Sequence, residues 1–194
     1  TTMSPANQIF DFVDLDGTWF TMKPQHSGMC IGVPSNSTGA YVQQQTCSGA
    51  TSQKWKAVVV GTGYQIINNA SGLCIEVPGS ATAYQTATQQ NTCGTSAATN
   101  QIWNFVNPTT LANVAFPTVT TGGGSGGSTV PGNIPPSASR IKVQHSGQCL
   151  DVRNISSNNG EYVDQYGCNT TMSPANQIFD FVDLDGTWFT MKPQ

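Results

Sequence analysis

The chain has 194 residues, which suits one compact domain with a linker, and only 9 % of them are charged, for a formal net charge of −3. This weakly acidic composition excludes the basic clusters that nucleic acids and anionic membrane surfaces require. No apolar run approaches the roughly 20 residues of a membrane-spanning helix, so a membrane span is also excluded.

The chain opens on a segment that it later repeats. Residues 1–25 recur without a change at 170–194, a spacing of 169 positions (170 − 1). Divergent repeats inside one fold do not match in this way. We therefore interpret 1–16 as a copy of 170–185, and the chain as a window on a tandem array of 169-residue units. The alternative is an engineered circular permutant with an overlapping end, which the glycine- and serine-rich tract at 122–128 would also suit.

Two β-rich repeats follow. Residues 17–60 contain β-branched or aromatic runs at 18–22 and 57–60, and residues 61–110 contain another at 64–67. Turn sequences such as Ser-Gly divide both segments. No segment shows a sustained apolar period of 3.6 residues, so we expect little helix.

Residues 111–138 are predicted to be a linker. They hold several prolines and the Gly/Ser tract, with few apolar anchors. A coil of this length spans on the order of 30 Å, which is enough to join neighbouring domains. The apolar residues Val114, Phe116 and Val130 are candidates to dock on a domain surface.

The last repeat, residues 139–185, opens on a β-rich run at 140–143, and residues 186–194 would begin the next repeat. All three repeats share one motif, which begins with Ser-Gly-x-Cys, contains a second cysteine and ends with Gln-x-aromatic. Three divergent copies of one motif indicate a fold built from three repeats.

Each repeat contains two cysteines, and this repetition selects one of the 15 pairings that six cysteines allow. We predict the disulfides Cys30–Cys47, Cys74–Cys93 and Cys149–Cys168. No Cys-x-x-Cys pair indicates a zinc site. Three evenly placed pairs in a chain rich in small polar residues indicate an oxidising, extracellular setting.

Taken together, the motif resembles the ricin B-type lectins and the family 13 carbohydrate-binding modules. The resemblance rests on Ser-Gly-x-Cys-Leu-Asp-Val at 146–152, on a tyrosine two positions before the second cysteine, and on Asn-Gln-x-aromatic. It covers all three repeats but not the linker. It implies an all-β fold, a β-trefoil of three divergent repeats. The aromatic residues that end the motif would be core residues, one per repeat: Phe10 or its copy Phe179, Trp55 and Trp103.

The resemblance also implies a shallow sugar pocket on each repeat. In it an acid accepts hydrogen bonds from two hydroxyls, an aromatic ring stacks on the sugar, and an Asn donates its amide. In the last repeat Asp151 would be the acid, Tyr166 the aromatic platform and Asn176 the amide. Gln177 lies beside Asn176, and Asp164 stands where relatives often have Gln.

The duplicated segment offers a second way to complete this pocket, because Asn7-Gln8 repeats Asn176-Gln177. In an array we expect the local copy, Asn176, to complete it, since no linker closure is then required. In a closed monomer the two copies would compete for one position.

The 61–110 repeat is a candidate weak second site. It keeps Glu76 and Asn100, with Gln89 nearby, but Asn91 replaces the aromatic platform unless Tyr84 reaches over from the preceding loop.

The 17–60 repeat is expected to have no site. Gly32 replaces the acid, Gln45 the platform and Ser52 the Asn.

No catalytic residue, metal site or cofactor is predicted. His26 and His145 stand at the equivalent position of two repeats, where the third repeat has Ala70, so we interpret them as turn residues. The Asp-Leu-Asp-Gly at 14–17 lacks the remaining ligands of a 12-residue calcium loop and is predicted to be an inter-strand turn.

The resemblance therefore implies an extracellular, non-catalytic carbohydrate-binding module, and the 169-residue period implies neighbouring copies joined head to tail. The alternative is a structural repeat unit of an extracellular filament or adhesin stalk with vestigial sugar sites. The two roles are compatible.

Overall fold

The structure is a computed structural model, and the residues that it describes are 5–116, 118–121, 128–131, 135–136, 138–169, 179–183 and 189–193. Within them the strands are short and the only helices are five 3-10 turns of three or four residues. The predicted all-β class and the scarcity of helix are therefore confirmed.

Each repeat has the same succession of a barrel strand, a hairpin, a 3-10 turn and a second barrel strand. The 17–60 repeat contains β2 (Phe20–Pro24), β3 (Cys30–Gly32), β4 (Gln43–Gln45), η2 (Thr51–Gln53) and β5 (Trp55–Val60). The 61–110 repeat contains β6 (Gly63–Asn68), β7 (Cys74–Glu76), η3 (Pro78–Ser80), β8 (Thr86–Ala87), β9 (Gln89–Asn91), η4 (Thr99–Gln101) and β10 (Trp103–Val106). The last repeat contains β13 (Arg140–Val143), β14 (Cys149–Val152), η5 (Arg153–Ile155) and β15 (Val163–Tyr166), and η1 (Pro5–Gln8) and β1 (Phe10–Asp14) complete it from the other end of the chain.

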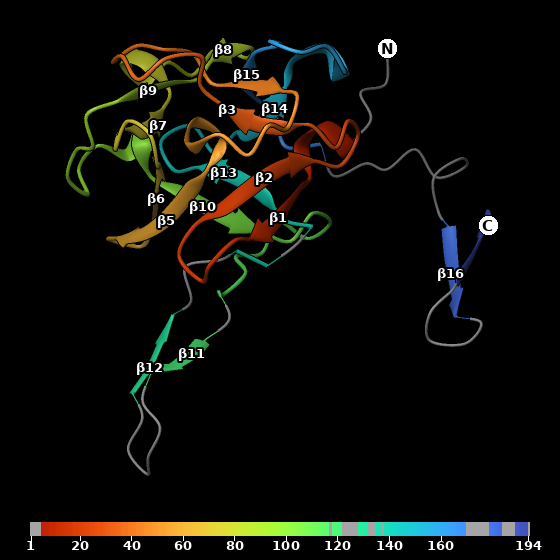
Figure 1. Cartoon of the computed structure of the whole chain (residues 1–194). Coiled ribbons are helices and arrows are strands. Elements are labelled where there is room, and N and C mark those ends of the chain that lie inside the picture. The colour runs from red at the N-terminus through yellow and green to blue at the C-terminus, as the bar shows by residue number, and fades with distance from the viewer. Residues whose placement is uncertain are drawn as a thin grey trace.

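Six strands close into a barrel in the order β1, β2, β5, β6, β10 and β13 (Figure 1). The ring closes between β13 and β1, where Phe10 and Ser139 exchange two backbone hydrogen bonds of 3.0 and 3.2 Å. The hairpins β3–β4, β7–β9 and β14–β15 form a cap at one end of the barrel. This arrangement is the β-trefoil that the sequence predicted.

Three backbone hydrogen bonds join the hairpins of the cap in a ring. The N–H of Val42 donates to Thr88, that of Thr88 to Val163, and that of Val163 back to Val42, at 2.9 to 3.0 Å. Each of these residues stands five positions before the second cysteine of its repeat. The ring therefore marks the pseudo-threefold axis.

A buried glutamine extends this linkage in every repeat. Gln44, Gln90 and Gln165 stand three positions before the second cysteine, and each side-chain amide donates two hydrogen bonds of 2.6 to 3.0 Å to loop carbonyls of a neighbouring repeat. Each side-chain oxygen accepts from the serine of its own Ser-Gly-x-Cys. We call these three residues the clasp glutamines. The motif as defined above does not include them, although a Gln at a constant offset before the second cysteine of all three repeats is a signal in the sequence.

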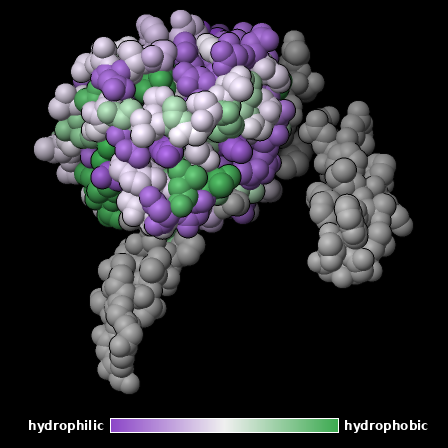
Figure 2. Space-filling view, viewed as in Figure 1, coloured by the Kyte–Doolittle hydropathy of each residue, from purple (hydrophilic) through white to green (hydrophobic). Residues whose placement is uncertain are grey.

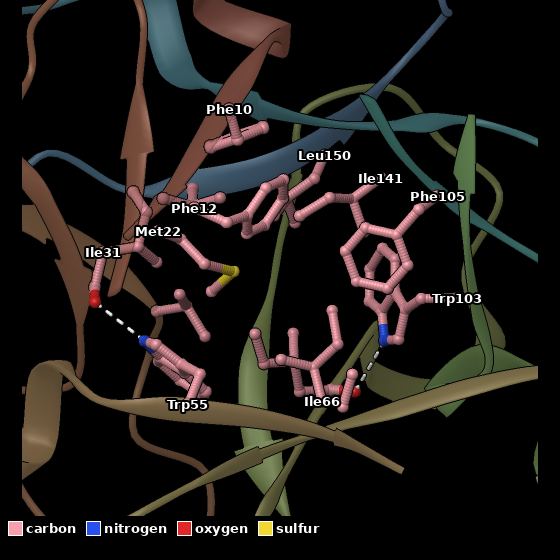
Figure 3. Close-up of a cluster of buried hydrophobic side chains, with 14 of the residues drawn as sticks. Phe10, Phe12, Met22, Ile31, Trp55, Ile66, Trp103, Phe105, Ile141 and Leu150 are labelled. Carbon is pink, nitrogen blue, oxygen red and sulfur yellow. Dashed lines mark hydrogen bonds between the residues drawn. The ribbon is translucent and has the colours of Figure 1, made fainter. Parts of the chain in front are cut away.

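The aromatic residues that end the motif lie in the core, as predicted (Figure 3). Phe10, Trp55 and Trp103 are fully buried. The indole N–H groups of Trp55 and Trp103 donate to the carbonyls of Ile31 and Ile75 at 2.8 and 3.0 Å, so each indole ties the barrel to a hairpin of the cap.

The three predicted disulfides are confirmed. They join Cys30 to Cys47, Cys74 to Cys93 and Cys149 to Cys168, with Cα–Cα distances of 5.0 to 5.1 Å. Each closes a loop of 17 or 19 residues, for which the loop-entropy model gives about 3 kcal/mol of stabilisation.

The segment predicted to be a linker is partly structured. Val114 and Phe116 pack on the barrel, where the Phe116 ring stacks on Tyr64 at 4.2 Å. Beyond them, β11 (Thr118–Thr121) pairs with β12 (Ser128–Pro131), although the sequence predicts coil there. The threonines and valines of these strands favour extended backbone. The glycine-rich residues 122–127 lie outside the described residues.

The second copy of the duplicated segment forms the same hairpin as the first. β16 (Phe179–Asp183) pairs with β17 (Phe189–Pro193), and Phe179 faces Pro193 just as Phe10 faces Pro24 between β1 and β2. Only the first copy takes part in the barrel, since β16 and β17 join no other described strand.

The clasp glutamines are expected to be stabilising. Replacing Gln44 with Ala removes the two hydrogen bonds that its amide donates to Ser156 and Asn158 and the one that it accepts from Ser27, so the free energy of unfolding should fall by about 2–4 kcal/mol in a urea titration. Its half-buried neighbour Gln43 is the matched control, and Gln43→Ala should cost less than about 1 kcal/mol. Equal losses of unfolding free energy in the two variants would contradict a special stabilising role for the clasp glutamine.

Candidate functional site

The candidate site of the last repeat is built on the β14–β15 hairpin. Asp151 lies directly opposite Asp164, and Tyr166 lies opposite Cys149. Directly opposite residues of an antiparallel pair share a face, and alternate residues of one strand do as well. Asp151, Asp164 and Tyr166 are therefore on the same face of this hairpin.

Asp151 is held by two amides from the first copy of the duplicated segment. The carboxylate is 2 % exposed, and its Oδ2 accepts hydrogen bonds from Asn7 Nδ2 at 2.9 Å and from Gln8 Nε2 at 2.8 Å. Gln8 is fixed in turn, because its Oε1 accepts from the buried guanidinium of Arg140.

Asn176 and Gln177 lie outside the described residues, so their part in the pocket stays a prediction for an array. In the structure Asn7 and Gln8 occupy that position. Asn7 is itself buried, and its Nδ2 also donates to the carbonyl of Val152 at 3.1 Å. Its amide is thus committed to the protein.

Asp164 is fully buried and pairs with Arg153. Its Oδ2 accepts from Arg153 Nε at 2.9 Å, and its Oδ1 is buried with no hydrogen-bond partner among the described residues. The same guanidinium lies over the ring of Tyr162, 5.2 Å from the centroid, and donates to the carbonyl of Gln85 at 2.8 Å. Arg153 thus links Asp164 to two neighbouring loops.

Burial raises the pKa of both carboxyl groups. The pKa of Asp151 rises to about 7, chiefly because burial penalises its charge and also because of the charge of Asp164; the amides of Gln8 and Asn7 and the charge of Arg140 oppose the rise. The pKa of Asp164 rises to about 6 because burial outweighs the ion pair with Arg153. Near neutral pH, Asp151 is therefore about half protonated.

The aromatic platform consists of two rings from different repeats. Tyr166 is half-buried, and the ring of Tyr84 lies against it with a centroid distance of 4.8 Å and an interplanar angle of 33°. From its position in the sequence, Tyr84 is a candidate for the site of its own 61–110 repeat. In the structure it faces the site of the last repeat, because the loop before β8 crosses to pair with β15.

Several hydrogen bonds fix the loop that carries Tyr84. The clasp residue Gln165 donates to the carbonyls of Ala81 and Ala83, and the N–H of Gln85 donates to the carbonyl of Gln165 at 2.9 Å. The position of Tyr84 is therefore set by the contact between repeats.

The candidate second site, around Glu76, is filled by side chains of the protein. Three amides donate to its buried carboxylate, from Gln89 at 2.7 Å, Asn91 at 2.8 Å and Gln101 at 3.0 Å. Asn100 donates to the carbonyl of Val77 instead. Asn91, which replaces the platform, thus turns inward to the acid.

The 17–60 repeat has no room for an acid. A Cβ added at Gly32 would lie 2.8 Å from Gln45 Oε1 and 2.9 Å from Gln53 Cγ. Gln45 therefore occupies the space that the acid takes in the other repeats.

The remaining candidates have structural contacts. His26 and His145 use Nε2 to contact loop carbonyls of neighbouring repeats, Ser156 and Ala81, at 2.8 Å. Asp14 and Asp16 accept backbone N–H bonds within the β1–β2 turn, as an inter-strand turn requires. The described residues contain no group of three or more His, Cys, Asp or Glu side chains that could hold a metal ion.

A pocket of about 280 Å³ lies elsewhere, lined by Tyr64, Phe105, Val114 and their neighbours. None of its lining residues is acidic, so it lacks the acid that the sugar site requires.

The surface is largely polar. The face shown in Figure 2 is mostly hydrophilic or neutral, with hydrophobic residues in small, scattered groups. Within the described part of the chain, no helix is both long and apolar enough to cross a membrane.

A closed barrel of three repeats, each with a capping hairpin, defines a β-trefoil, and the acid and aromatic on one hairpin face are the arrangement expected of a lectin-type trefoil. The family model of the ricin-type beta-trefoil lectin domain matches residues 18–128. That is more than half of the chain, and the chain therefore belongs to this family.

Solved structures agree with this fold. A designed threefold symmetric protein, ThreeFoil, is 26 % identical with a TM-score of 0.61, over 80 % of this chain and 93 % of its own. The exo-beta-1,3-galactanase 1,3Gal43A from Clostridium thermocellum is 21 % identical with a TM-score of 0.57, over 89 % of this chain but 30 % of its own. The C-half of the earthworm R-type lectin, solved with GalNAc, is 9 % identical with a TM-score of 0.50, over 91 % of this chain and 99 % of its own. No curated protein matches the chain.

The two carboxyl groups should make the protein more stable in mild acid. Their pKa values in the folded state exceed the unfolded value of about 3.9, so the folded state binds more protons between about pH 4 and pH 7. Their contribution to the free energy of unfolding is largest at pH 4 and is lost as the pH rises to 7.

Asp151→Asn removes this titration but keeps an oxygen that can accept from Asn7 and Gln8. As the pH rises from 4.5 to 7.5, the free energy of unfolding of the wild type should fall relative to that of the variant by on the order of 2–4 kcal/mol. Urea titrations of both proteins at the two pH values provide the measurement. Parallel pH profiles would show that Asp151 titrates normally.

Proposed function

We propose that this domain binds carbohydrate non-covalently, outside the cell, through the face of the last repeat that carries Asp151 and Tyr166, and that it has no enzymatic activity of its own. Membership of the ricin-type lectin family supports the ligand class. The position of the site is supported by the carboxyl group of Asp151 and the half-buried Tyr166 on one hairpin face, with the exposed Tyr84 of the neighbouring repeat packed against Tyr166.

The chemistry of this face suits a sugar. A pyranose presents an apolar face to an aromatic ring and a rim of hydroxyls to polar groups. Both amides that hold Asp151 donate to Oδ2, which leaves Oδ1 to accept a bond from a hydroxyl. Tyr166 and Tyr84 supply the ring surface beside it.

Asn7 and Gln8 act in this proposal as positioning residues. Their amides fix the carboxyl group of Asp151, and Arg140 fixes Gln8. In an array the copies Asn176 and Gln177 would take the same place, since the two segments have the same sequence.

The other two repeats contribute little. The acid Glu76 already accepts three amide bonds, and the 17–60 repeat has Gln45 in the place of an acid. The domain therefore has one principal site, and its affinity for a single sugar is expected to be weak. Several copies on one array would raise it by multivalency.

Tyr166→Ala should abolish binding on a glycan array, because the residue left at the platform position no longer covers the apolar face of the sugar. Asn91→Ala, at the equivalent position of the 61–110 repeat, is the matched control and should leave binding unchanged. Binding that survives the double substitution Asp151→Ala and Tyr166→Ala would remove the site assignment.

A second candidate role is that of a structural repeat unit, and the duplicated hairpin favours it. β16–β17 has the sequence and the register of β1–β2 but joins no other described strand. A hairpin identical to the one that completes the barrel can complete the barrel of a neighbouring copy instead. Such an exchange joins copies head to tail, which is the heterologous contact that produces filaments.

The intact mass under denaturing, reducing conditions distinguishes a covalent array from separate chains. A mass many times larger than 20.5 kDa is expected for a covalent array of 169-residue units. A species near 20.5 kDa would rule out the covalent array. In that case a permutant or a strand-exchanged assembly of separate chains would remain, and sedimentation under native conditions would detect the assembly by its size.

A further inference from the structure

The tyrosines around β15 extend beyond the single pocket. Among the large hydrophobic residues that the described chain exposes, the only aromatic ones are Tyr41, at 45 %, and Tyr84, at 62 %. Tyr41 comes from the 17–60 repeat and Tyr84 from the 61–110 repeat, yet both lie against tyrosines of the last repeat. Exposed aromatic rings are thus concentrated where the three repeats meet.

Two tyrosine pairs flank β15. Tyr41 packs edge-on against Tyr162 with ring centroids 5.1 Å apart, and Tyr84 packs against Tyr166 at 4.8 Å. Tyr162 and Tyr166 are four residues apart along an extended backbone, and residues at even spacing on a strand share a face. At about 3.3 Å per residue, their Cα atoms are separated by about 13 Å, which exceeds the width of one sugar ring.

Arg153 connects the two pairs. Its guanidinium lies over Tyr162, pairs with the buried Asp164 and donates to the carbonyl of Gln85, the residue next to Tyr84. Its hydrogen bonds and its stacking hold it between the two pairs, and its side chain remains 25 % exposed. The surface therefore alternates apolar rings with a polar group, in the order Tyr41, Tyr162, Arg153, Tyr84 and Tyr166. We call it the tyrosine strip.

We propose that the tyrosine strip binds a chain of several sugar residues, so that the ligand of this domain is an oligosaccharide or polysaccharide and not a single terminal sugar. This inference rests on the proposed function and deepens it. The strip is continuous with the Asp151 and Tyr166 face through the contact between Tyr84 and Tyr166.

The chemistry of the strip favours this ligand. Successive pyranose units of a chain offer apolar faces separated by hydroxyls and ring oxygens, which match rings separated by a guanidinium. The rings of Tyr41 and Tyr84 are exposed and those of Tyr162 and Tyr166 are half-buried. All four lie outside the barrel core and are fixed by contacts between repeats, so little ordering is required on binding. Asp164 serves as a positioning residue because it holds Arg153.

The probes are three monosaccharides, galactose, xylose and mannose, and three soluble polymers, galactan, xylan and mannan. Isothermal titration with the monosaccharides and affinity electrophoresis with the polymers measure binding to the full chain. At least one polymer should bind more tightly, per sugar unit, than its monosaccharide. Tyr41→Ala and Tyr84→Ala should each weaken polymer binding by about three- to tenfold. Tyr41→Ala should leave monosaccharide binding unchanged, because Tyr41 lies at the far end of the strip.

Trp19→Ala is the matched control, because Trp19 also carries a cation over its ring, with Lys56 Nζ 5.0 Å from the centroid, but it lies just before β2. Polymer binding that is unchanged by both tyrosine substitutions, with monosaccharide binding intact, would overturn the tyrosine strip and leave the proposed function standing. Failure of the wild type to bind any of the six probes would count against both. Circular dichroism of each variant tests whether it still folds. We expect that it does, because Tyr41 and Tyr84 are 45 % and 62 % exposed.

Discussion

Each repeat of this trefoil gives one buried glutamine amide to a loop of a neighbouring repeat, and the three contacts run in a ring around the pseudo-threefold axis. The carbonyls that receive them lie in loops outside the strand ladders. The three glutamines are buried, and a buried amide left without partners costs about 1–3 kcal/mol. Gln44, Gln90 and Gln165 each satisfy two of these carbonyls, and the backbone ring of Val42, Thr88 and Val163 lies beside them. Since every clasp needs a loop of a neighbouring repeat, the ring of clasps is complete only when all three repeats are present.

The same ring determines what surrounds the candidate site. The clasp of Gln165 on the carbonyls of Ala81 and Ala83 places Tyr84 beside Tyr166. The contact of β4 with the last repeat similarly places Tyr41 beside Tyr162. Surface chemistry on β15 is therefore a property of the assembled trefoil, and a single repeat would present only half of each tyrosine pair.

The three repeats differ at the acid position, but one interaction is constant. The glutamine of Gln-x-aromatic always donates to the backbone carbonyl just before the second cysteine and also to the oxygen that stands in the acid position. The glutamines and their acceptors are Gln8 with Gly167 and Asp151, Gln53 with Thr46 and Gln45, and Gln101 with Thr92 and Glu76. This glutamine is thus structural everywhere. What differs between the repeats is the residue two positions before the second cysteine. Tyr166 remains at the surface, whereas Asn91 and Gln45 turn inward as hydrogen-bonding partners.

The sequence by itself determined the three repeats, the three disulfides and the aromatic core. These features repeat at constant offsets within each copy, so one copy supports the interpretation of the others. It also predicted Asp151 and Tyr166 as the acid and the aromatic of a sugar site, and the two residues lie on one face of the β14–β15 hairpin. Only the tertiary structure decided that Asn7 and Gln8 hold Asp151, that Asp151 and Asp164 are both buried and have raised pKa values, and that Tyr84 belongs to the neighbouring repeat's face. The physical reason is that these contacts join residues from 82 to 144 positions apart, across different repeats or opposite ends of the chain, where local pattern and spacing carry no information about proximity.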